Sequence, residues 1–328
     1  MYITPILLIT FNRPDHTRRV LTEILKAEPQ DLYVCQDGAR EGNENDYIKC
    51  HEVRNVVNEL TSAYKSSHEH FTLHTLYQQK NLGCGPGPQA GITWFFENVE
   101  QGIIMEDDCL PHPDFFGYCE ELLERYKDNP QVQFINSTLY HNRWKCEDSY
   151  GFSHYMVTGA WAAWRNTWQG FDLDLRDLDT QSLSNHVYQL TQSREEADWW
   201  YAKVCKIQND AKKKSYWDYQ MQIHLFQNNA LTIHPAVNLI SNIGFDAEGT
   251  HTLTNDGRGD KETQPILPLI HPNEIKVKNS LLDVQCFGKT QPESFWHWLK
   301  HHIYIKVLYS DGITHKLLMR YKALKHAQ

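Results

Sequence analysis

The chain has no run of about 18 consecutive apolar residues, so no segment is long enough to be recognised as a membrane-spanning helix. Its N-terminus also lacks a basic segment followed by a long apolar stretch and a cleavage site, and we expect no signal peptide. Eight cysteines are scattered without a Cys-x-x-Cys pair or a Cys/His cluster of zinc spacing. This pattern favours reduced thiols, and together these absences predict a cytoplasmic protein.

An excess of basic residues is also missing. The 328 residues include 32 Lys and Arg against 41 Asp and Glu, which gives a net charge of −9. Because nucleic-acid binding needs a basic face, we expect no nucleic-acid partner. No Gly-x-x-x-x-Gly-Lys-Ser/Thr sequence occurs, and this excludes a P-loop.

Strands and helices are expected to alternate over the first 140 residues. Residues 5–10 form a short, continuous apolar run, which is typical of a strand buried on both faces. Comparable runs predict further strands, and the segments between them predict helices. Such alternation predicts an α/β fold with a mostly parallel central sheet and helices on both faces. The further expected strands are 32–35, 71–77, 103–105 and 133–135, and the expected helices include 46–64 and 113–127.

Chemically distinctive residues follow four of the expected strands. Arg13 follows the first, Asp37 the second, a Gly/Pro loop at 81–91 the third, and the acidic triplet Glu106-Asp107-Asp108 the fourth. In open α/β sheets, ligands bind outside the carboxyl ends of the strands. We therefore expect these residues to lie along one edge of the sheet, although they are far apart in the sequence.

The acidic triplet Glu106-Asp107-Asp108 is the strongest chemical signal. Ionised carboxylates at the end of a buried strand need a compensating charge, because burying them unpaired is costly. Carboxylate oxygens suit hard cations such as Mg2+ or Mn2+, which usually bridge to substrate phosphates. A solvated acidic turn is the alternative. The apolar strand before the triplet and the Pro-initiated helix after it favour a site for Mn2+ or Mg2+.

The Gly/Pro loop permits a second interpretation. Residues 85–90 formally match Gly-x-Gly-x-x-Ala, the spacing of a dinucleotide-binding turn. A Rossmann-type NAD(P)-binding oxidoreductase is therefore one alternative. However, Pro86 and Pro88 lack the N–H groups that a pyrophosphate would need, and the loop follows the third strand instead of the first.

Two later segments differ in composition. Seven of the ten tryptophans lie between Trp144 and Trp217, and they form either a dense aromatic core or platforms on which sugar rings stack. Trp161 is our candidate for such a contact. From Ser294 onward the chain combines aromatic and basic residues. This tail predicts either peripheral contact with an anionic membrane at its inner face or a helix pair packed on the domain.

Four short segments carry a family resemblance. They resemble GT-A type nucleotide-diphospho-sugar glycosyltransferases, including bacterial family 2-like members with a Gly-Ala-Trp stretch such as 159–161. Residues 104–118, in which Glu-Asp-Asp is followed by Pro-Asp-Phe-Phe, are similar to the metal-site segment of the N-acetylglucosaminyltransferase I type. The resemblance is good over residues 3–120 and patchy to about residue 252. The four segments are Thr10-Phe11-Asn12-Arg13, Gln36-Asp37-Gly38, Asn81-Leu82-Gly83 and Glu106-Asp107-Asp108.

The resemblance implies a role for each matching residue near the donor. Asp108 would bind the metal directly, and Glu106 and Asp107 would hold ribose or metal-bound water. Asp37 would accept from the N3–H of a uracil-like base, which implies a UDP-sugar. Arg13 would lie near the base or the diphosphate.

The remaining roles concern catalysis and a second metal contact. Asp218, in a Tyr-Trp-Asp-Tyr segment, matches the position of the catalytic base, although Tyr219 stands where the family has a second acid. The acids within 195–198 are the alternative base. His251 is a candidate ligand to the metal or diphosphate, with an ordinary hydrogen-bonded histidine as the alternative.

The resemblance also implies a domain organisation and a reaction. Residues 1–255 would form the GT-A domain, with a nucleotide-sugar half at about 1–140 and an acceptor half at about 141–255. Residues 256–328 would form a C-terminal extension with a helical basic tail. The implied activity is inverting, metal-assisted transfer of a sugar to a glycan or lipid-linked acceptor. Besides the oxidoreductase, a nucleotidyltransferase and a non-catalytic sugar-binding or nucleotide-sugar-binding protein are the rival classes.

Overall fold

The first strand begins in the apolar run at residues 5–10, as the sequence predicts. In the computed structural model, which describes residues 3–139, 147–209, 216–245, 259 and 261–277, strands and helices then alternate. Up to residue 139 the elements are β1 (Ile6–Thr10), α1 (Pro14–Lys26), β2 (Asp31–Gln36), α2 (Glu44–Lys65), β3 (Thr72–Tyr77), α3 (Pro86–Asn98), β4 (Gln101–Glu106), β5 (Cys109–Pro111), α4 (Asp114–Tyr126) and β6 (Val132–Asn136).

Four strands and four helices follow in the described residues. They are β7 (Tyr150–Ser153), β8 (Ala160–Trp164), α5 (Arg165–Trp168), α6 (Thr180–Thr191), α7 (Arg194–Asn209), α8 (Asp218–Gln227), β9 (Leu231–Pro235) and β10 (Ile240–Asn242). No helix in the described ranges is both long and apolar enough to cross a bilayer.

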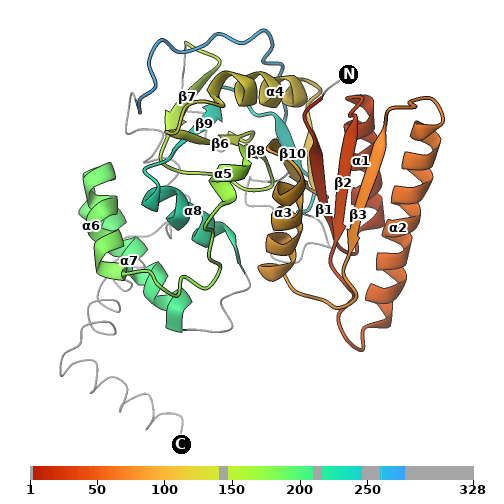
Figure 1. The fold of residues 1–328 in the computed structure, drawn as a ribbon, viewed down its shortest axis with the longest axis horizontal. Helices are drawn as coiled ribbons and strands as arrows, with labels where there is room; N and C mark the ends of the chain where they lie inside the picture. The colour runs from red at the N-terminus through yellow and green to blue at the C-terminus, as the bar shows by residue number, and fades with distance from the viewer. Residues whose placement is uncertain (1–2, 140–146, 210–215, 246–258, 260, 278–328) are drawn as a thin grey trace, which may run out of the picture. The chain divides into compact units, whose positions relative to one another are not determined.

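Within the described residues, eight strands form one mixed sheet in the order β3-β2-β1-β4-β8-β6-β9-β7 (Figure 1). The strands β3, β2, β1 and β4 are parallel, and β6 and β9 are parallel to each other. β8 lies antiparallel between β4 and β6, and β7 is antiparallel to β9. The predicted α/β class is therefore confirmed. The strands whose carboxyl ends carry the predicted site residues are paired in parallel.

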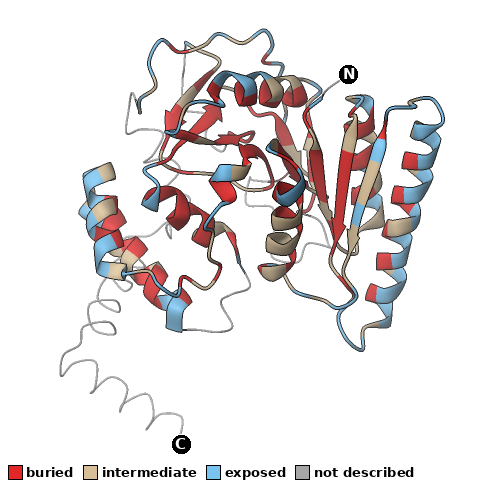
Figure 2. Ribbon diagram, in the orientation of Figure 1, coloured by how far each residue is buried: buried red, intermediate tan, exposed pale blue. Residues whose placement is uncertain are grey.

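The central strands are buried on both faces because helices cover both (Figure 2). Side chains alternate between faces along a strand, and Ile6 and Leu8 of β1 belong to one apolar cluster while Leu7 belongs to the other. The first cluster includes side chains of α1, α2 and α4, and the second includes side chains of α3 and α8. This explains why the strands are continuous apolar runs in the sequence.

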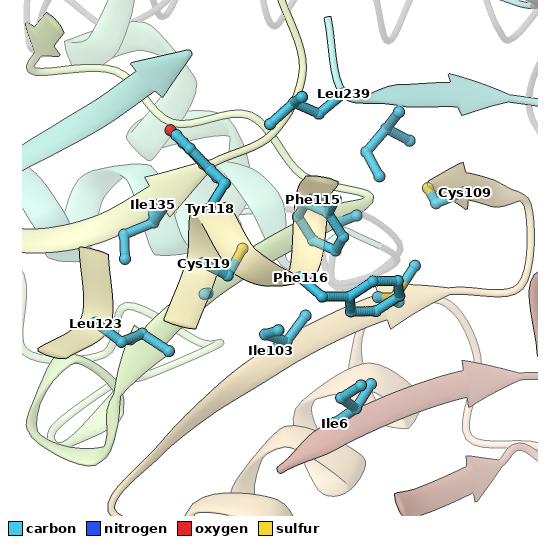
Figure 3. Packing of buried hydrophobic residues seen from close by; sticks show 14 of the residues in the cluster. Ile6, Ile103, Cys109, Phe115, Phe116, Tyr118, Cys119, Leu123, Ile135 and Leu239 are labelled. Atoms are coloured by element: carbon cyan, nitrogen blue, oxygen red, sulfur yellow. The ribbon is translucent and has the colours of Figure 1, made fainter. Parts of the chain in front are cut away.

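Helix α4 packs its apolar stripe on the first face of the sheet. Phe115, Phe116, Cys119 and Leu123 are fully or almost fully buried, and they gather over the strand residues Ile6, Ile103 and Ile135 (Figure 3). The helix begins directly after the turn that carries the acidic triplet and β5. Its packing therefore fixes where that turn leaves the sheet.

The chain divides into two units. The first comprises residues 1–173 and 215–279 and contains the sheet with the helices that cover it; the second comprises residues 174–214 and 280–328. In the second unit α6 and α7 pack on each other, and Ser184 of α6 donates to the carbonyl of Ala197 at 3.2 Å. The domain boundary at residue 255 remains a prediction, and the basic tail after Ser294 lies outside the described residues.

Candidate active site at the carboxyl ends of the parallel strands

A cavity of about 340 Å³ opens at the carboxyl ends of β1, β2 and β4. Ligands of open α/β sheets bind at this edge. The structure brings together here residues from all four segments that the sequence singled out, and it adds side chains from distant parts of the first unit. The lining includes Arg13, Asp37, Arg40, Asn81, Cys84, Glu106, Asp107, Asp108, Thr158, Tyr216, Trp217, Asp218 and Gly244.

The acidic triplet spans the end of a strand and a tight turn. Glu106 is the last residue of β4, and Asp107 and Asp108 form the turn into β5. β5 pairs antiparallel with β10, and the amide of Ile243 donates to the carbonyl of Asp108 at 2.8 Å. This pairing brings Gly244 against the triplet. A Cβ at Gly244 would lie 2.4 Å from Asp108 Oδ2, so a side chain there would force Asp108 to shift.

Arg13 compensates part of the acidic charge. Its guanidinium forms an ion pair with Asp107, and its Nη1 donates to Asp108 Oδ2 at 3.0 Å. All three side chains are largely buried, with 15% of Arg13 and 3% of Asp107 exposed. The resemblance implies that Arg13 lies near the base or the diphosphate, and in the structure its guanidinium lies between two carboxylates. A compensating charge within the protein is therefore already present, although it is one cation beside three acids.

Burial raises the pKa of two carboxyl groups of the triplet. It raises the pKa of Glu106 to about 8, with the nearby Asp108 carboxylate adding to the shift and Arg13 opposing it. The pKa of Asp107 is also raised by burial, and Arg13 opposes that shift. Near neutral pH the protonated form of Glu106 is thus favoured.

These residues fit a divalent cation of a particular kind. Among the described residues, no three His, Cys, Asp or Glu side chains form a group that could hold a metal ion. Mg2+, however, is usually bound through one or two carboxylates together with waters and substrate phosphates. Asp108 lines the cavity, and Asp107 Oδ2 is buried without a hydrogen-bond partner. The carboxylates therefore suit an ion that a diphosphate helps to hold.

Asp37 follows β2 and is surrounded by hydrogen-bond donors of the chain itself. Its carboxylate accepts from the backbone amides of Gly38, Leu82 and Gly83, and from the side-chain amide of Asn81. Burial raises its pKa, and the three backbone amides oppose that shift. The side chain thus ties the end of β2 to the loop before α3.

A second polar network shapes the neighbouring wall of the cavity. Asp46 at the start of α2 is fully buried and accepts from Asn12 Nδ2 and Arg40 Nη2, both at 2.8 Å. These bonds lower the pKa of Asp46, with Arg40 as the main cause. The Arg40 guanidinium also lies 5.7 Å from the centre of the Phe11 ring. Phe11 and Arg40 therefore reach the cavity in fixed positions.

Asp218 lines the same cavity from a later part of the chain. It is the first residue of α8, and one carboxylate oxygen accepts from the Tyr219 amide at 2.9 Å. Further along α8, Gln222 accepts from the Met156 amide at 2.7 Å and donates to the His154 carbonyl at 2.8 Å. This buried amide fixes the helix to the loop that carries Thr158.

Trp161 is not among the residues that line the cavity. Trp161 is only 1% exposed and stacks on Phe134, with its ring 5.9 Å from that of Trp217. It therefore packs behind Trp217, which lines the cavity. The alternative base residues Glu195, Glu196 and Asp198 lie on α7 of the second unit. His251 lies outside the described residues.

The start of α3 does not offer a pyrophosphate-binding turn. Pro86 and Pro88 have no N–H group, while the amides of Gly87 and Gln89 donate to the carbonyls of Gly83 and Gly85. A dinucleotide would need free donors at these positions. The Gly-x-Gly-x-x-Ala match thus gains no support from the geometry of the loop.

Comparison with known proteins gives only distant likenesses. No family model matches the sequence, and no curated protein matches it. A mannosyltransferase from Pyrobaculum calidifontis, solved with GDP-Man and Mn2+, is 10% identical over 69% of this chain and 70% of its own, with a TM-score of 0.37. An apo UDP-glucose pyrophosphorylase is 10% identical over 75% of this chain and 95% of its own, with a TM-score of 0.42.

A third solved structure, S. aureus TarS 1–349, is 8% identical over 62% of this chain and 71% of its own, with a TM-score of 0.35. At such identities and TM-scores these likenesses carry no inference about binding or catalysis. The α/β class rests on the sheet order and pairing described above, and the function has to be argued from the cavity.

Sequence reasoning missed several residues of the cavity. Gly244 follows β10, and Thr158 precedes the Gly-Ala-Trp stretch, so neither follows a strand of the parallel region. Arg40 is a polar residue in a loop without a recognisable spacing. Gly244, two residues after the end of β10, was the one available signal, because an isolated glycine beside a short strand often marks a close approach of backbone to another group.

Proposed function

We propose that this chain is a metal-assisted, inverting glycosyltransferase of the GT-A type. Its donor would be a nucleotide-diphospho-sugar, with a UDP-sugar as the first to test, and its acceptor a glycan or a lipid-linked glycan. One observation carries the proposal. The acidic triplet, Arg13 and the carboxylate of Asp218 meet in one cavity at the edge of the sheet, although they come from three separate parts of the chain.

The acidic side of the cavity is suited to the diphosphate. Asp108, together with Asp107, would hold Mn2+ or Mg2+, and Glu106 would contact the ribose or a metal-bound water. When bound, the cation would act as a Lewis acid that stabilises the charge on the leaving diphosphate. Arg13 would lie beside the same phosphates, since Asp107 and Asp108 hold its guanidinium at the cavity wall.

Asp218 would act as the base. It is the first residue of α8 and lines the same cavity as the acidic triplet. Asp218 would take the proton of an acceptor hydroxyl while that oxygen bonds to the anomeric carbon. The bond between this carbon and the diphosphate oxygen breaks at the same time. A single displacement of this kind inverts the configuration.

Calorimetric titration with UDP, with and without Mn2+, tests the donor half of the proposal. We expect binding that depends on Mn2+, and we expect Asp108→Asn to remove that dependence. Asp31→Asn is the matched control, because Asp31 lies at the other end of β2 and contacts His74 at 3.1 Å. Binding of UDP that ignores Mn2+, or no binding of UDP, would contradict this half.

Release of UDP from UDP-glucose, UDP-galactose and UDP-N-acetylglucosamine tests the catalytic half. Asp218→Asn should still bind UDP. Its rate of UDP formation from the UDP-sugar should fall by at least about 100-fold, the usual contribution of a general base. If the variant keeps its rate, the base is another group, and the acids within 195–198 come next. A protein that binds UDP-sugars without ever releasing UDP would fit the non-catalytic alternative.

A further inference from the structure

The carboxylate of Asp37 already has four hydrogen bonds from the chain itself. Oδ1 accepts from the amides of Gly38 and Leu82, both at 2.8 Å. Oδ2 accepts from the amide of Gly83 at 2.9 Å and from Asn81 Nδ2 at 3.0 Å. A carboxylate offers about four lone-pair positions, so none is left for a further donor.

Three of these four donors belong to the loop between β3 and α3. Asn81 adds a second bond, from Nδ2 to the carbonyl of Gly38 at 2.9 Å, which joins the loop to the end of β2 again. Gly83 has a φ of +87°, a conformation that glycine adopts without strain. The loop therefore depends on a particular backbone path, and Asp37 holds that path from within.

The loop and the end of β2 also approach each other closely. A Cβ at Gly38 would lie 2.5 Å from the carbonyl carbon of Lys80, so the two backbones are in direct contact. On the other side, a Cβ at Gly87 of α3 would lie 3.2 Å from Asp37 Oδ2. The carboxylate is thus enclosed by the strand end, the loop and the first turn of α3.

We propose that Asp37 is a positioning residue that fixes the loop at 81–83 as one wall of the cavity, and that it does not select the nucleotide base. This inference rests on the proposed function. An N3–H of uracil could reach the carboxylate only by displacing one of the loop donors. N3 carries a hydrogen in uracil but not in cytosine. Because Asp37 makes no hydrogen bond to N3, it does not distinguish UDP from CDP donors.

Hydrogen exchange of the Leu82 and Gly83 amides, measured without nucleotide, tests the positioning role. In Asp37→Asn one oxygen becomes an NH2 group that faces donors, and we expect these two amides to exchange about tenfold faster or more, as for a lost charge-assisted hydrogen bond. Asp31→Asn, the same change at the other end of β2, should leave both rates unchanged. Unchanged rates in Asp37→Asn would overturn the positioning role.

Calorimetry with UDP and with CDP tests base selection. We expect Asp37→Asn to weaken both nucleotides by the same factor, which leaves their affinity ratio as in the wild type. If the side chain contacts the base directly, its new NH2 group would donate to N3 of cytosine, and the ratio would shift toward CDP. Such a shift would overturn the inference.

The two measurements separate this inference from the proposed function. Absence of UDP and CDP binding in the wild type would refute the function and the statement on base selection, while the exchange rates would still decide the positioning role. If Asp37→Asn does not fold, Asn81→Ala removes one loop donor and leaves Asp37 in place. It should accelerate exchange at Leu82 and Gly83 without changing the ratio of UDP to CDP, and failure of either result would count against the inference.

Discussion

Replacing Arg13 by methionine should reveal how strongly the acidic triplet depends on a counter-ion. Arg13 pairs with Asp107 and with Asp108, and these side chains are mostly buried. Methionine fills similar space without charge. The change would leave the two carboxylates beside Glu106, whose pKa burial already raises to about 8, without the guanidinium that pairs with both.

The expected cost follows from the burial of the pair. Removing one partner of a buried ion pair usually costs about 3–5 kcal/mol. Protonation of the abandoned carboxyl groups limits the loss, so the lower end, about 3 kcal/mol, is our expectation for the free energy of unfolding. At about 2–4 °C per kcal/mol for a domain of this size, the midpoint of thermal unfolding should fall by about 6–12 °C.

Urea denaturation and thermal scans with and without Mn2+ measure both parts of this prediction. Arg18→Met is the matched control, because Arg18 lies in α1, the helix that begins directly after Arg13, but its pair with Glu59 is exposed. The control should lose much less stability. Mn2+ should restore part of the stability of Arg13→Met, because the cation replaces the missing counter-charge. Equal losses in the two variants, or no effect of Mn2+ on Arg13→Met, would refute the reasoning.

Three further predictions address the same cavity. Between about pH 4.5 and about pH 8 the folded chain binds more protons at Glu106 than the unfolded chain, so the free energy of unfolding should fall as the pH rises. Urea midpoints measured across this range should show the decline, and Glu106→Gln should flatten it. Gly244→Ala places a Cβ 2.4 Å from Asp108 Oδ2 and should weaken Mn2+-dependent UDP binding in calorimetry; affinity equal to the wild type would contradict the close approach. Cys84 is exposed and lines the cavity, so UDP with Mn2+ should slow its alkylation by N-ethylmaleimide, followed by mass spectrometry, and an unchanged rate would place the nucleotide elsewhere.

The parallel half of the sheet could be predicted because its signals are local. Strands β1 and β4 are short apolar runs, since each strand is covered on both faces, and the polar residues that follow them lie at the same edge. The order of strands beyond β4 was not predictable in this way. β8 inserts antiparallel between β4 and β6, and no local pattern in Ala160–Trp164 records which neighbours it will have.

The roles of single residues depended on contacts over long sequence distances. Trp161 was a candidate for a sugar contact, but the structure buries it behind Trp217, because the antiparallel β8 directs its side chain into the second apolar cluster. Arg13 and Asp107 are 94 positions apart, and their pairing follows only from the adjacency of β1 and β4.

By itself, the sequence determined which strands are buried, and hence that Arg13, Asp37 and the acidic triplet meet at one edge of an α/β sheet. Only the tertiary structure decided how those side chains are used. The pairing of β5 with β10 places Gly244 on Asp108, and the loop before α3 occupies every acceptor position of Asp37. The physical reason is that periodicity and burial are properties of a segment, whereas the partner of a charged group is set by whichever distant backbone the fold brings against it.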